Sequence, residues 1–314
     1  MRIVLTGATG FLGRHLLPEL SAAGHDCLAL TRYPPACREL SVLPRVQVVR
    51  ADVFDPESLR LHLDGADALI NMVGILNESG RKGKGFQRVH VELTERLLAA
   101  CQDRGIRRFL QVSAVGAGQG SSHYLVSKGK AEELIRAADG LDATIVQPSV
   151  IFGRGDAFFN RFAALLKMAP VLPLACPDAA MQPVWAGDVS RLIALTIEDP
   201  GSYGRTLVAV GPRSYTLREL VELTGAMSGH RRPIVGLPDS LSRLQAMVMD
   251  FVPGKPFSSD NYRSLQTPNT SDQNSLLDYG IRPRSVESTV PGYLGCSPRQ
   301  RRLNESRKFG GADQ

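Results

Sequence analysis

The stretch "RIVLTGATGFLGRHL", residues 2–16, decides the fold prediction for this chain. It opens with an apolar run typical of a buried strand and ends with the apolar spacing of a helix. Between them, glycines at 7, 10 and 13 form a G-x-x-G-x-x-G turn. A glycine turn between a strand and a helix is typical of dinucleotide sites, because it lets the pyrophosphate reach the helix N-terminus. A turn with a purely structural role is the alternative.

Short apolar segments alternate with helical ones over the first 150 residues. Near-continuous apolar strands separated by helices indicate a parallel sheet covered on both faces. The predicted fold class is therefore α/β, a Rossmann doubly wound parallel sheet with a smaller C-terminal α/β substrate domain. Beyond the strand of the glycine turn, we expect strands at 27–32, 46–52, 68–74, 108–114, 143–153 and 206–211, and helices at 11–23, from Pro56, at 89–104 and from Tyr124.

The domain prediction follows the point where this alternation stops. Residues 1–152 are expected to form the NAD(P)-binding Rossmann domain, to which 183–211 return, while 153–182 and 212–295 form the smaller domain. In the smaller domain, Thr216 and Glu219 form a capping box at a helix start. A second helix carries an apolar side that we interpret as domain core, with association with an assembly as the alternative. That side comprises Leu241, Leu244, Met247, Val248 and Phe251.

Composition excludes several classes of protein. The net charge is +6, but residues 296–314 alone carry five basic and two acidic residues, so we expect a basic disordered tail there. The body lacks a basic stripe with interleaved aromatics, so no nucleic-acid partner is expected. Five scattered cysteines and six dispersed histidines predict a reducing compartment and no metal site. Without a long apolar run or signal peptide, we expect no transmembrane segment and a cytoplasmic location, or peripheral association with the inner membrane.

The end of the second expected strand bears on the choice of cofactor. Enzymes that use NAD place a carboxylate there for the ribose hydroxyls, whereas an arginine can pair with the 2′-phosphate of NADP. Arg32 holds this position, so NADP(H) is favoured and NAD(H) is the alternative. Asp52 is placed to contact the adenine, and Asn71, Val73 and Gly74 to line the ribose. The predicted cofactor-binding residues are Gly7, Thr9, Gly10, Phe11, Leu12, Gly13, Arg32, Asp52, Val53, Asn71, Val73, Gly74, Lys128, Pro148 and Val150.

Three further residues predict proton-transfer chemistry. Tyr124 and Lys128 lie four apart at a helix start and so on one face. A tyrosine pKa is about 10, and a nearby ammonium would lower it. Ser113 ends a strand at the sheet edge that binds ligands, where its hydroxyl could hold a carbonyl or alcohol oxygen. Together they form an acid/base set for hydride transfer. Without the glycine turn and the serine, a chance surface pair would explain Tyr124 and Lys128.

With these motifs the chain resembles the short-chain dehydrogenase/reductase superfamily, in its extended or atypical branch. The segments "PSVIFGRGDAFFNRF" (148–162) and "QPVWAGDVSRLI" (182–193) are similar to the accessory-subunit family of respiratory complex I and its bacterial relatives. The resemblance implies a Rossmann domain with a small C-terminal domain, and eukaryotic members of that family bind NADPH tightly and act structurally. Many extended members carry an asparagine near the position of His90, and this departure weakens a sugar-epimerase interpretation.

Two functions stay open at this point. The first is an NADP(H)-dependent oxidoreductase acting on an unidentified carbonyl or alcohol, in which Tyr124 exchanges the proton, Ser113 orients the substrate oxygen and Lys128 tunes Tyr124. The second is a non-catalytic NADPH-binding accessory or assembly protein of the complex I type, with peripheral association with a respiratory or membrane complex. The sequence names neither the substrate nor the oligomeric state.

Overall fold

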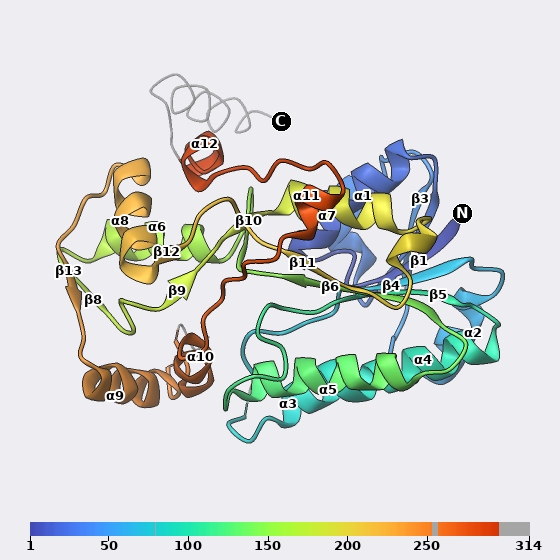
Figure 1. Ribbon diagram of the computed structural model, residues 1–314, viewed down its shortest axis with the longest axis horizontal. Coiled ribbons are helices and arrows are strands. Elements are labelled where there is room, and N and C mark those ends of the chain that lie inside the picture. Colours follow the sequence, from blue (N-terminus) through green and yellow to red (C-terminus); the bar gives the residue numbers. More distant parts are fainter. Residues whose placement is uncertain (79, 253–256, 295–314) are drawn as a thin grey trace, which may run out of the picture.

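The computed structural model describes residues 1–78, 80–252 and 257–294. The expected disordered tail, residues 296–314, lies outside the described residues. The described part is built around a seven-stranded sheet with the smaller domain beyond one end of its strands (Figure 1).

The seven strands are parallel and follow the order β11-β6-β5-β4-β1-β2-β3. Strand order reverses between β1 and β4, and open α/β sheets bind ligands at such a switch point, beyond the carboxyl ends of the strands. The α/β Rossmann prediction is confirmed. From one edge to the other the strands are β11 (Thr206–Ala209), β6 (Asp142–Pro148), β5 (Arg108–Val112), β4 (Ala68–Asn71), β1 (Arg2–Thr6), β2 (Asp26–Thr31) and β3 (Val46–Arg50).

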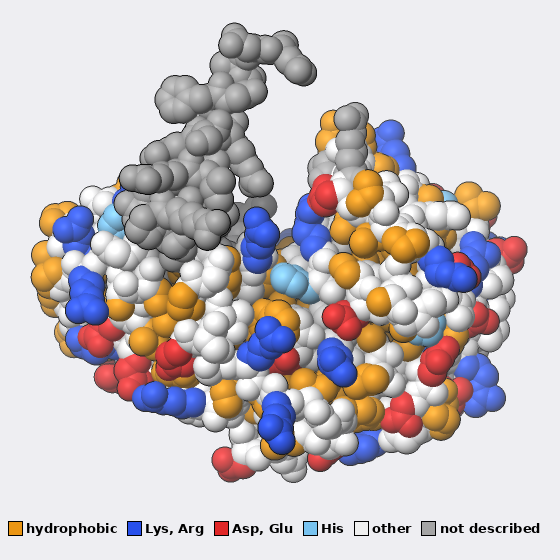
Figure 2. Space-filling view, turned by 90° about the horizontal axis from the view of Figure 1, so that it is seen from above, with side chains coloured by type: hydrophobic (Ala, Val, Ile, Leu, Met, Phe, Trp, Pro, Cys, Tyr) orange, Lys and Arg blue, Asp and Glu red, His pale blue; other side chains and the backbone are white. Residues whose placement is uncertain are grey.

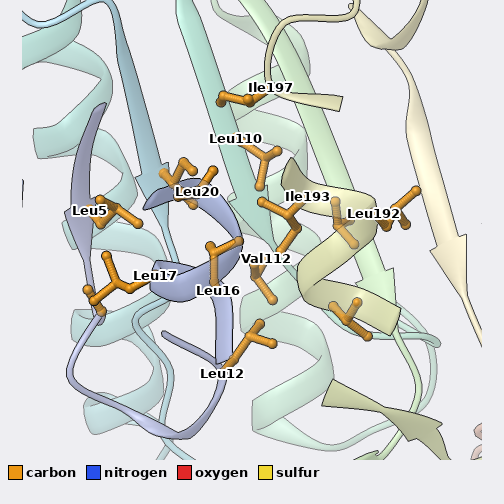
Figure 3. Packing of buried hydrophobic residues seen from close by; sticks show 14 of the residues in the cluster. Leu5, Leu12, Leu16, Leu17, Leu20, Leu110, Val112, Leu192, Ile193 and Ile197 are labelled. Atoms are coloured by element: carbon orange, nitrogen blue, oxygen red, sulfur yellow. The ribbon is translucent and has the colours of Figure 1, made fainter. Parts of the chain in front are cut away.

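Helices cover both faces of the sheet (Figure 1). Because successive side chains of a strand point to opposite faces, Ile3 and Leu5 join one apolar cluster and Val4 joins the other. In the first cluster, Leu16 and Leu20 of α1 pack with the side chains of α7 and β5 (Figure 3). One face is covered by α1 (Phe11–Ala22), α7 (Ala186–Thr196) and α11 (Ser275–Asp278), and the other by α2 (Pro56–Leu63), α4 (Leu93–Asp103) and α5 (His123–Ala137).

Two expected elements are divided in the structure. The segment 143–153 forms β6 and a separate strand β7 (Ile151–Phe152), which pairs with β10 (Val184–Trp185). Proline offers no N–H for continuing the ladder, and the chain leaves the sheet after Pro148. The helix expected at 89–104 begins earlier, as α3 (Lys84–Phe86) and a π-helical stretch η2 (Gln87–Glu92) that precede α4. Such π-helical turns are rare and frequently lie at functional sites.

The smaller domain has its own apolar cluster, to which Phe159, Leu166 and Leu220 contribute. The capping box of Thr216 and Glu219 is confirmed at the start of α8. Besides α8 (Leu217–Ser228), the remaining elements are α6 (Phe158–Met168), α9 (Asp239–Met249), α10 (Ser259–Leu265), α12 (Val286–Thr289), α13 (Pro291–Leu294), β8 (Leu172–Leu174), β9 (Ala180–Met181), β12 (Tyr215–Thr216), β13 (Ile234–Gly236) and the 3-10 turns η1 (Pro34–Leu40) and η3 (Pro200–Ser202).

The interpretation of the apolar side of α9 as domain core is wrong. This helix buries only Ser242 and Ala246. The helix uses its small residues for the contact with the body, so its large apolar side chains are left at the surface. Their exposed fractions are Leu241 46%, Leu244 50%, Met247 46%, Val248 55% and Phe251 76%.

Surface charge is mixed on the face seen in Figure 2. Lys and Arg side chains are spread over this face and are interleaved with acidic and apolar ones. Within the described residues, no helix is long and apolar enough to cross a membrane. The same residues contain no cluster of three or more His, Cys, Asp or Glu side chains arranged to hold a metal ion.

Candidate functional site

The glycine turn has the geometry of a phosphate cradle. Gly7 adopts a φ of 74°, and a Cβ there would lie 2.8 Å from the carbonyl carbon of Met72. The amide of Gly10 donates to the carbonyl of Gly7 at 3.0 Å and so closes the turn. A Cβ on Gly13 would overlap the carbonyl of Ala8, so this glycine lets the first turn of α1 pack against the glycine turn. A side chain at Gly7 or Gly13 would therefore deform the cradle.

Beyond the turn, α1 presents its N-terminus without a side-chain cap. The N-cap residue is Gly10, which has no side chain to cap the helix. The amides of Phe11, Leu12 and Gly13 form the first helical turn, where N–H groups have no intrahelical acceptor. Free amides and the helix dipole favour an anion, so the residues present fit a pyrophosphate.

Arginines flank the turn at the end of β2. The hydroxyls of Thr9 and Thr31 lie 3.3 Å apart and join the turn to this strand end. The Arg14 side chain donates to the carbonyl of Thr9 and forms an ion pair with Glu39. Arg32 follows the strand, is exposed, and has no ion pair within the described residues. Its guanidinium is therefore free to meet an anion next to the turn.

Two expected nucleotide contacts follow β3. One oxygen of the exposed Asp52 carboxylate accepts the amide of Phe54 at 2.9 Å, which fixes the loop. Val53 is half-buried and packs against the second apolar cluster. The Asp52 carboxylate keeps a second oxygen for a ligand at this edge.

The Asn71 side chain, expected to line a ribose, is used inside the protein. It is 1% exposed. Its carbonyl oxygen accepts from the hydroxyl of Thr6 at 2.7 Å and from the amide of Val73 at 3.1 Å, and its amide donates to Gln111 at 2.9 Å. These bonds join the ends of β1, β4 and β5, because buried polar groups need partners. The exposed Gly74, directly after Val73, presents backbone to the site.

Lys128 is directed at the end of β5. Its Nζ donates to the carbonyl of Val112 at 3.0 Å, and the side chain is buried. Burial lowers the pKa of this lysine to about 8, although the carboxylate of Glu132 works in the opposite direction. A Cβ on Gly74 would lie 3.5 Å from Nζ, so the ammonium borders the loop after β4. A lysine that titrates near neutral pH is suited to proton exchange.

Tyr124 lies among aromatic rings at the start of α5. Its ring centroid is 5.6 Å from that of His90 and 6.0 Å from that of Phe86. We expected Lys128 to lower the phenol pKa, but burial raises the pKa of Tyr124 to about 12. The predicted direction is wrong: the Lys128 ammonium is engaged with the Val112 carbonyl, and burial is what shifts the phenol pKa. The phenol is therefore protonated at neutral pH.

His90 connects this tyrosine to the loop after β4. Its Nε2 lies 3.3 Å from the amide of Ile75, which can only donate, so Nδ1 carries the proton. Nδ1 then donates to the hydroxyl of Ser127 at 2.8 Å, and Ser127 donates to the carbonyl of Tyr124 at 2.8 Å. Burial and the nearby Lys128 lower the pKa of His90 to about 2, so the ring stays neutral. The sequence analysis noted His90 only because many members of the resembling family carry an asparagine near this position.

The Ser113 hydroxyl is hydrogen-bonded to a residue of α5. Its hydroxyl donates to the buried carboxylate of Glu132 at 2.5 Å. Glu132 also accepts from Gln147 at 2.7 Å and from Arg136 at 2.6 Å. Within the described residues Ser113 makes no hydrogen bond to Tyr124 or Lys128. The hydroxyl proton is thus used in the bond to Glu132, and the role of Ser113 in orienting a substrate oxygen stays a prediction.

The segment after β6 is held by a residue that sequence reasoning missed. The Pro148 carbonyl accepts from the amide of Val115 at 2.9 Å. The amide of Val150 donates to the side chain of Asn269 at 2.8 Å, and Asn269 donates back to the Val115 carbonyl at 3.4 Å. Asn269 thus fixes the two expected cofactor contacts relative to the chain after β5.

A second missed residue caps the helix that carries the tyrosine. The carboxylate of Asp260, in α10, accepts from the amides of His123 and Tyr124 at 2.7 and 3.1 Å. It also accepts from the hydroxyl of Ser122, the N-cap of α5, at 3.2 Å. The partners lie more than 130 residues apart in sequence, so no local pattern could have shown the contact. The smaller domain therefore positions the start of α5.

The comparisons with known proteins agree with this geometry. A family described as NAD(P)H-binding matches residues 7–156. The NADH dehydrogenase [ubiquinone] 1 alpha subcomplex subunit 9 of Arabidopsis thaliana is 30% identical over 92% of this chain and 76% of that protein. A ceramide reductase of Caulobacter vibrioides is 31% identical over 76% of this chain and 74% of that protein.

The fold is also found among solved structures. A dTDP-glucose 4,6-dehydratase of Streptomyces venezuelae, solved with NAD, matches with a TM-score of 0.75 over 98% of both chains at 22% identity. The two curated relatives, at 30% and 31% identity, show the family, and the solved structure shows the fold. The chain belongs to the NAD(P)-binding short-chain dehydrogenase/reductase family, in the branch that contains the alpha subcomplex subunit 9 of respiratory complex I.

Proposed function

We propose that this protein is an NADP(H)-dependent oxidoreductase that works in the direction of carbonyl reduction. The observation that carries the proposal is the pair at the start of α5. Tyr124 is a phenol held protonated at neutral pH, with its pKa raised to about 12, and Lys128, whose pKa is lowered to about 8, lies one turn away. A protonated phenol beside a lysine that exchanges protons suits a general acid better than a general base.

The chain's own residues would hold the cofactor along the switch point of the sheet. The first-turn amides of α1 would bind the pyrophosphate, and the exposed Arg32 would pair with a 2′-phosphate, which favours NADP(H) over NAD(H). Asp52 and the loop at Gly74 border the adenine and ribose sides. Titrating NADPH and NADH separately by fluorescence measures this preference, and tighter binding of NADPH is expected.

The proposed reaction needs a hydride, a proton and an oriented substrate. When bound, a reduced nicotinamide supplies the hydride. The Tyr124 hydroxyl gives its proton to the carbonyl oxygen as that oxygen becomes an alcohol, and Lys128, one helical turn away, would return a proton to the phenolate. The neutral His90 holds Tyr124 through Ser127 and so fixes the tyrosine backbone relative to the loop after β4. Ser113 then has a structural role, because its hydrogen bond to Glu132 joins the end of β5 to α5.

The test is NADPH oxidation with a panel of aldehydes and ketones that includes long-chain amphiphilic carbonyls, since one relative is a ceramide reductase. Tyr124→Phe is expected to lower kcat/KM by about 10²- to 10⁴-fold, the usual contribution of a positioned acid. NADPH affinity should stay near the wild-type value. Tyr203→Phe is the matched control, because Tyr203 stacks with Arg108 away from the site. Equal rates for wild type and Tyr124→Phe would remove the proposed role.

A second function is favoured by the complex I relative. A non-catalytic NADPH-binding accessory or assembly protein would keep the glycine cradle and need no oriented serine, which matches the diversion of Ser113 to Glu132. Such a protein would lie at the cytoplasmic side of the inner membrane, in peripheral association with a respiratory complex. Comigration with complex I on native gels, together with bound NADPH that no carbonyl oxidises, would decide for this function.

A further inference from the structure

The exposed side of α9 forms an apolar surface at the outer end of the smaller domain (Figure 1). We call it the α9 face and define it as Leu241, Leu244, Met247, Val248, Phe251 and Val252, each between 38% and 76% exposed. With 3.6 residues per turn Leu241, Leu244, Met247 and Val248 form one stripe opposite the buried Ser242 and Ala246. Phe251 and Val252 follow the end of the helix. A contiguous stripe of large apolar side chains in water marks an interaction site.

The charges that border the α9 face are basic. Arg81 lies over the ring of Phe251, with its guanidinium carbon 3.9 Å from the ring centroid. Lys82 and Lys84 follow within three residues and are exposed, and Arg243 is exposed on the flank of the helix itself. We define the basic rim as Arg81, which contacts the face, the exposed Lys82 and Lys84 that follow it in the chain, and Arg243 on the helix.

The acidic residues nearby are each hydrogen-bonded within the protein. Asp239 is exposed at the start of α9 and accepts from the hydroxyl of Tyr262 at 2.6 Å. Asp250 is 7% exposed, accepts from the hydroxyl of Ser259 at 2.7 Å and forms an ion pair with Arg81 at 3.9 Å. Asp260 is engaged with the start of α5. The exposed rim therefore carries more basic than acidic side chains around an apolar middle.

From this complementarity we propose that the α9 face docks on the surface of an anionic lipid bilayer. An amphipathic helix with large apolar side chains and flanking Lys and Arg residues lies in the bilayer interface, with its apolar side among the acyl chains and its cations at the phosphates. A second copy of this chain is a poorer occupant, because a two-fold contact would place the basic rims against each other. The proposal does not depend on the proposed reductase activity.

The experiment is co-sedimentation of the full chain with vesicles of phosphatidylcholine, with and without phosphatidylglycerol. Wild type is expected to bind the anionic vesicles, to bind the neutral ones weakly, and to dissociate as salt is raised. Leu244→Glu and the pair Lys82→Glu with Lys84→Glu should each lower affinity by about tenfold or more. Leu61→Glu is the matched control, since Leu61 is a 70% exposed leucine of α2 outside the face.

Three outcomes would overturn the proposal. Binding that survives the α9 and lysine variants would place the lipid contact elsewhere, with residues 296–314 the first place to look. Equal binding to neutral vesicles would remove the role of the basic rim. A wild-type dimer that Leu244→Glu dissociates in light scattering would make a second copy the occupant. Circular dichroism and NADPH titration of each variant establish that the fold is intact.

Discussion

Helices α1 and α9 look alike in the sequence and differ in the structure. Both carry leucines at helical spacing, yet Leu16 of α1 is 0% exposed and Leu244 of α9 is 50% exposed. The first is covered by α7 and the sheet, whereas the second buries only its small residues. Periodicity therefore predicts that a helix has an apolar side, but what covers that side is decided by the tertiary structure.

Leu16→Ala is expected to have the largest effect on stability. Its side chain is fully buried between α1, α7 and β5, so truncation leaves a cavity and should lower the free energy of unfolding by about 2–5 kcal/mol. Urea denaturation followed by circular dichroism measures the change. A loss under about 1 kcal/mol would mean that the site collapses around the cavity or that this cluster is looser than described.

His90→Asn tests whether the buried His90 ring is held neutral in the folded protein. The folded pKa of His90, about 2, lies below the ordinary 6.5. Between these values the unfolded chain binds more protons, so stability is lost as the pH falls below 6.5. For this group, linkage gives a loss of about 2 kcal/mol between pH 7 and pH 5.

Asparagine does not titrate, so the difference in unfolding free energy between wild type and His90→Asn should shrink by that amount at the lower pH. Urea denaturation at both pH values gives the comparison. His15 and His25 also have lowered pKa values, but they are present in both proteins and cancel. A difference that stays constant with pH would show that His90 is not held neutral.

Leu244→Ala is expected to have the smallest effect. The side chain is half exposed, so its loss should change the free energy of unfolding by no more than about 0.5 kcal/mol. The same urea denaturation that measures Leu16→Ala measures this variant. A loss comparable to that of Leu16→Ala would show that another part of the chain covers α9 and would end the contrast between the two helices.

Local patterns predicted the fold and the cofactor turn, because both depend on contacts between near neighbours in sequence. The glycines at 7, 10 and 13 and the alternation of strands and helices needed no tertiary information. The four-residue spacing of Tyr124 and Lys128 predicted that both lie on one face of a helix. The diversion of Ser113 to Glu132 could not be predicted, because it depends on where one helix lies over one strand end. The internal bonds of Asn71, and the opposite direction of the Tyr124 pKa shift, come from burial that spacing does not report.

The cap that Asp260 places on α5 gives the molecule a coupling between distant surfaces. Its helix, α10, is bonded to α9 through Tyr262 and Asp239, and to α5 at the amide of Tyr124. A shift of α9 would therefore reach the helix that carries Tyr124, the proposed proton donor. Thermodynamic reciprocity then fixes the sign and size of the reverse effect: if a bound surface tightens the nucleotide site by some factor, the nucleotide tightens surface attachment by the same factor.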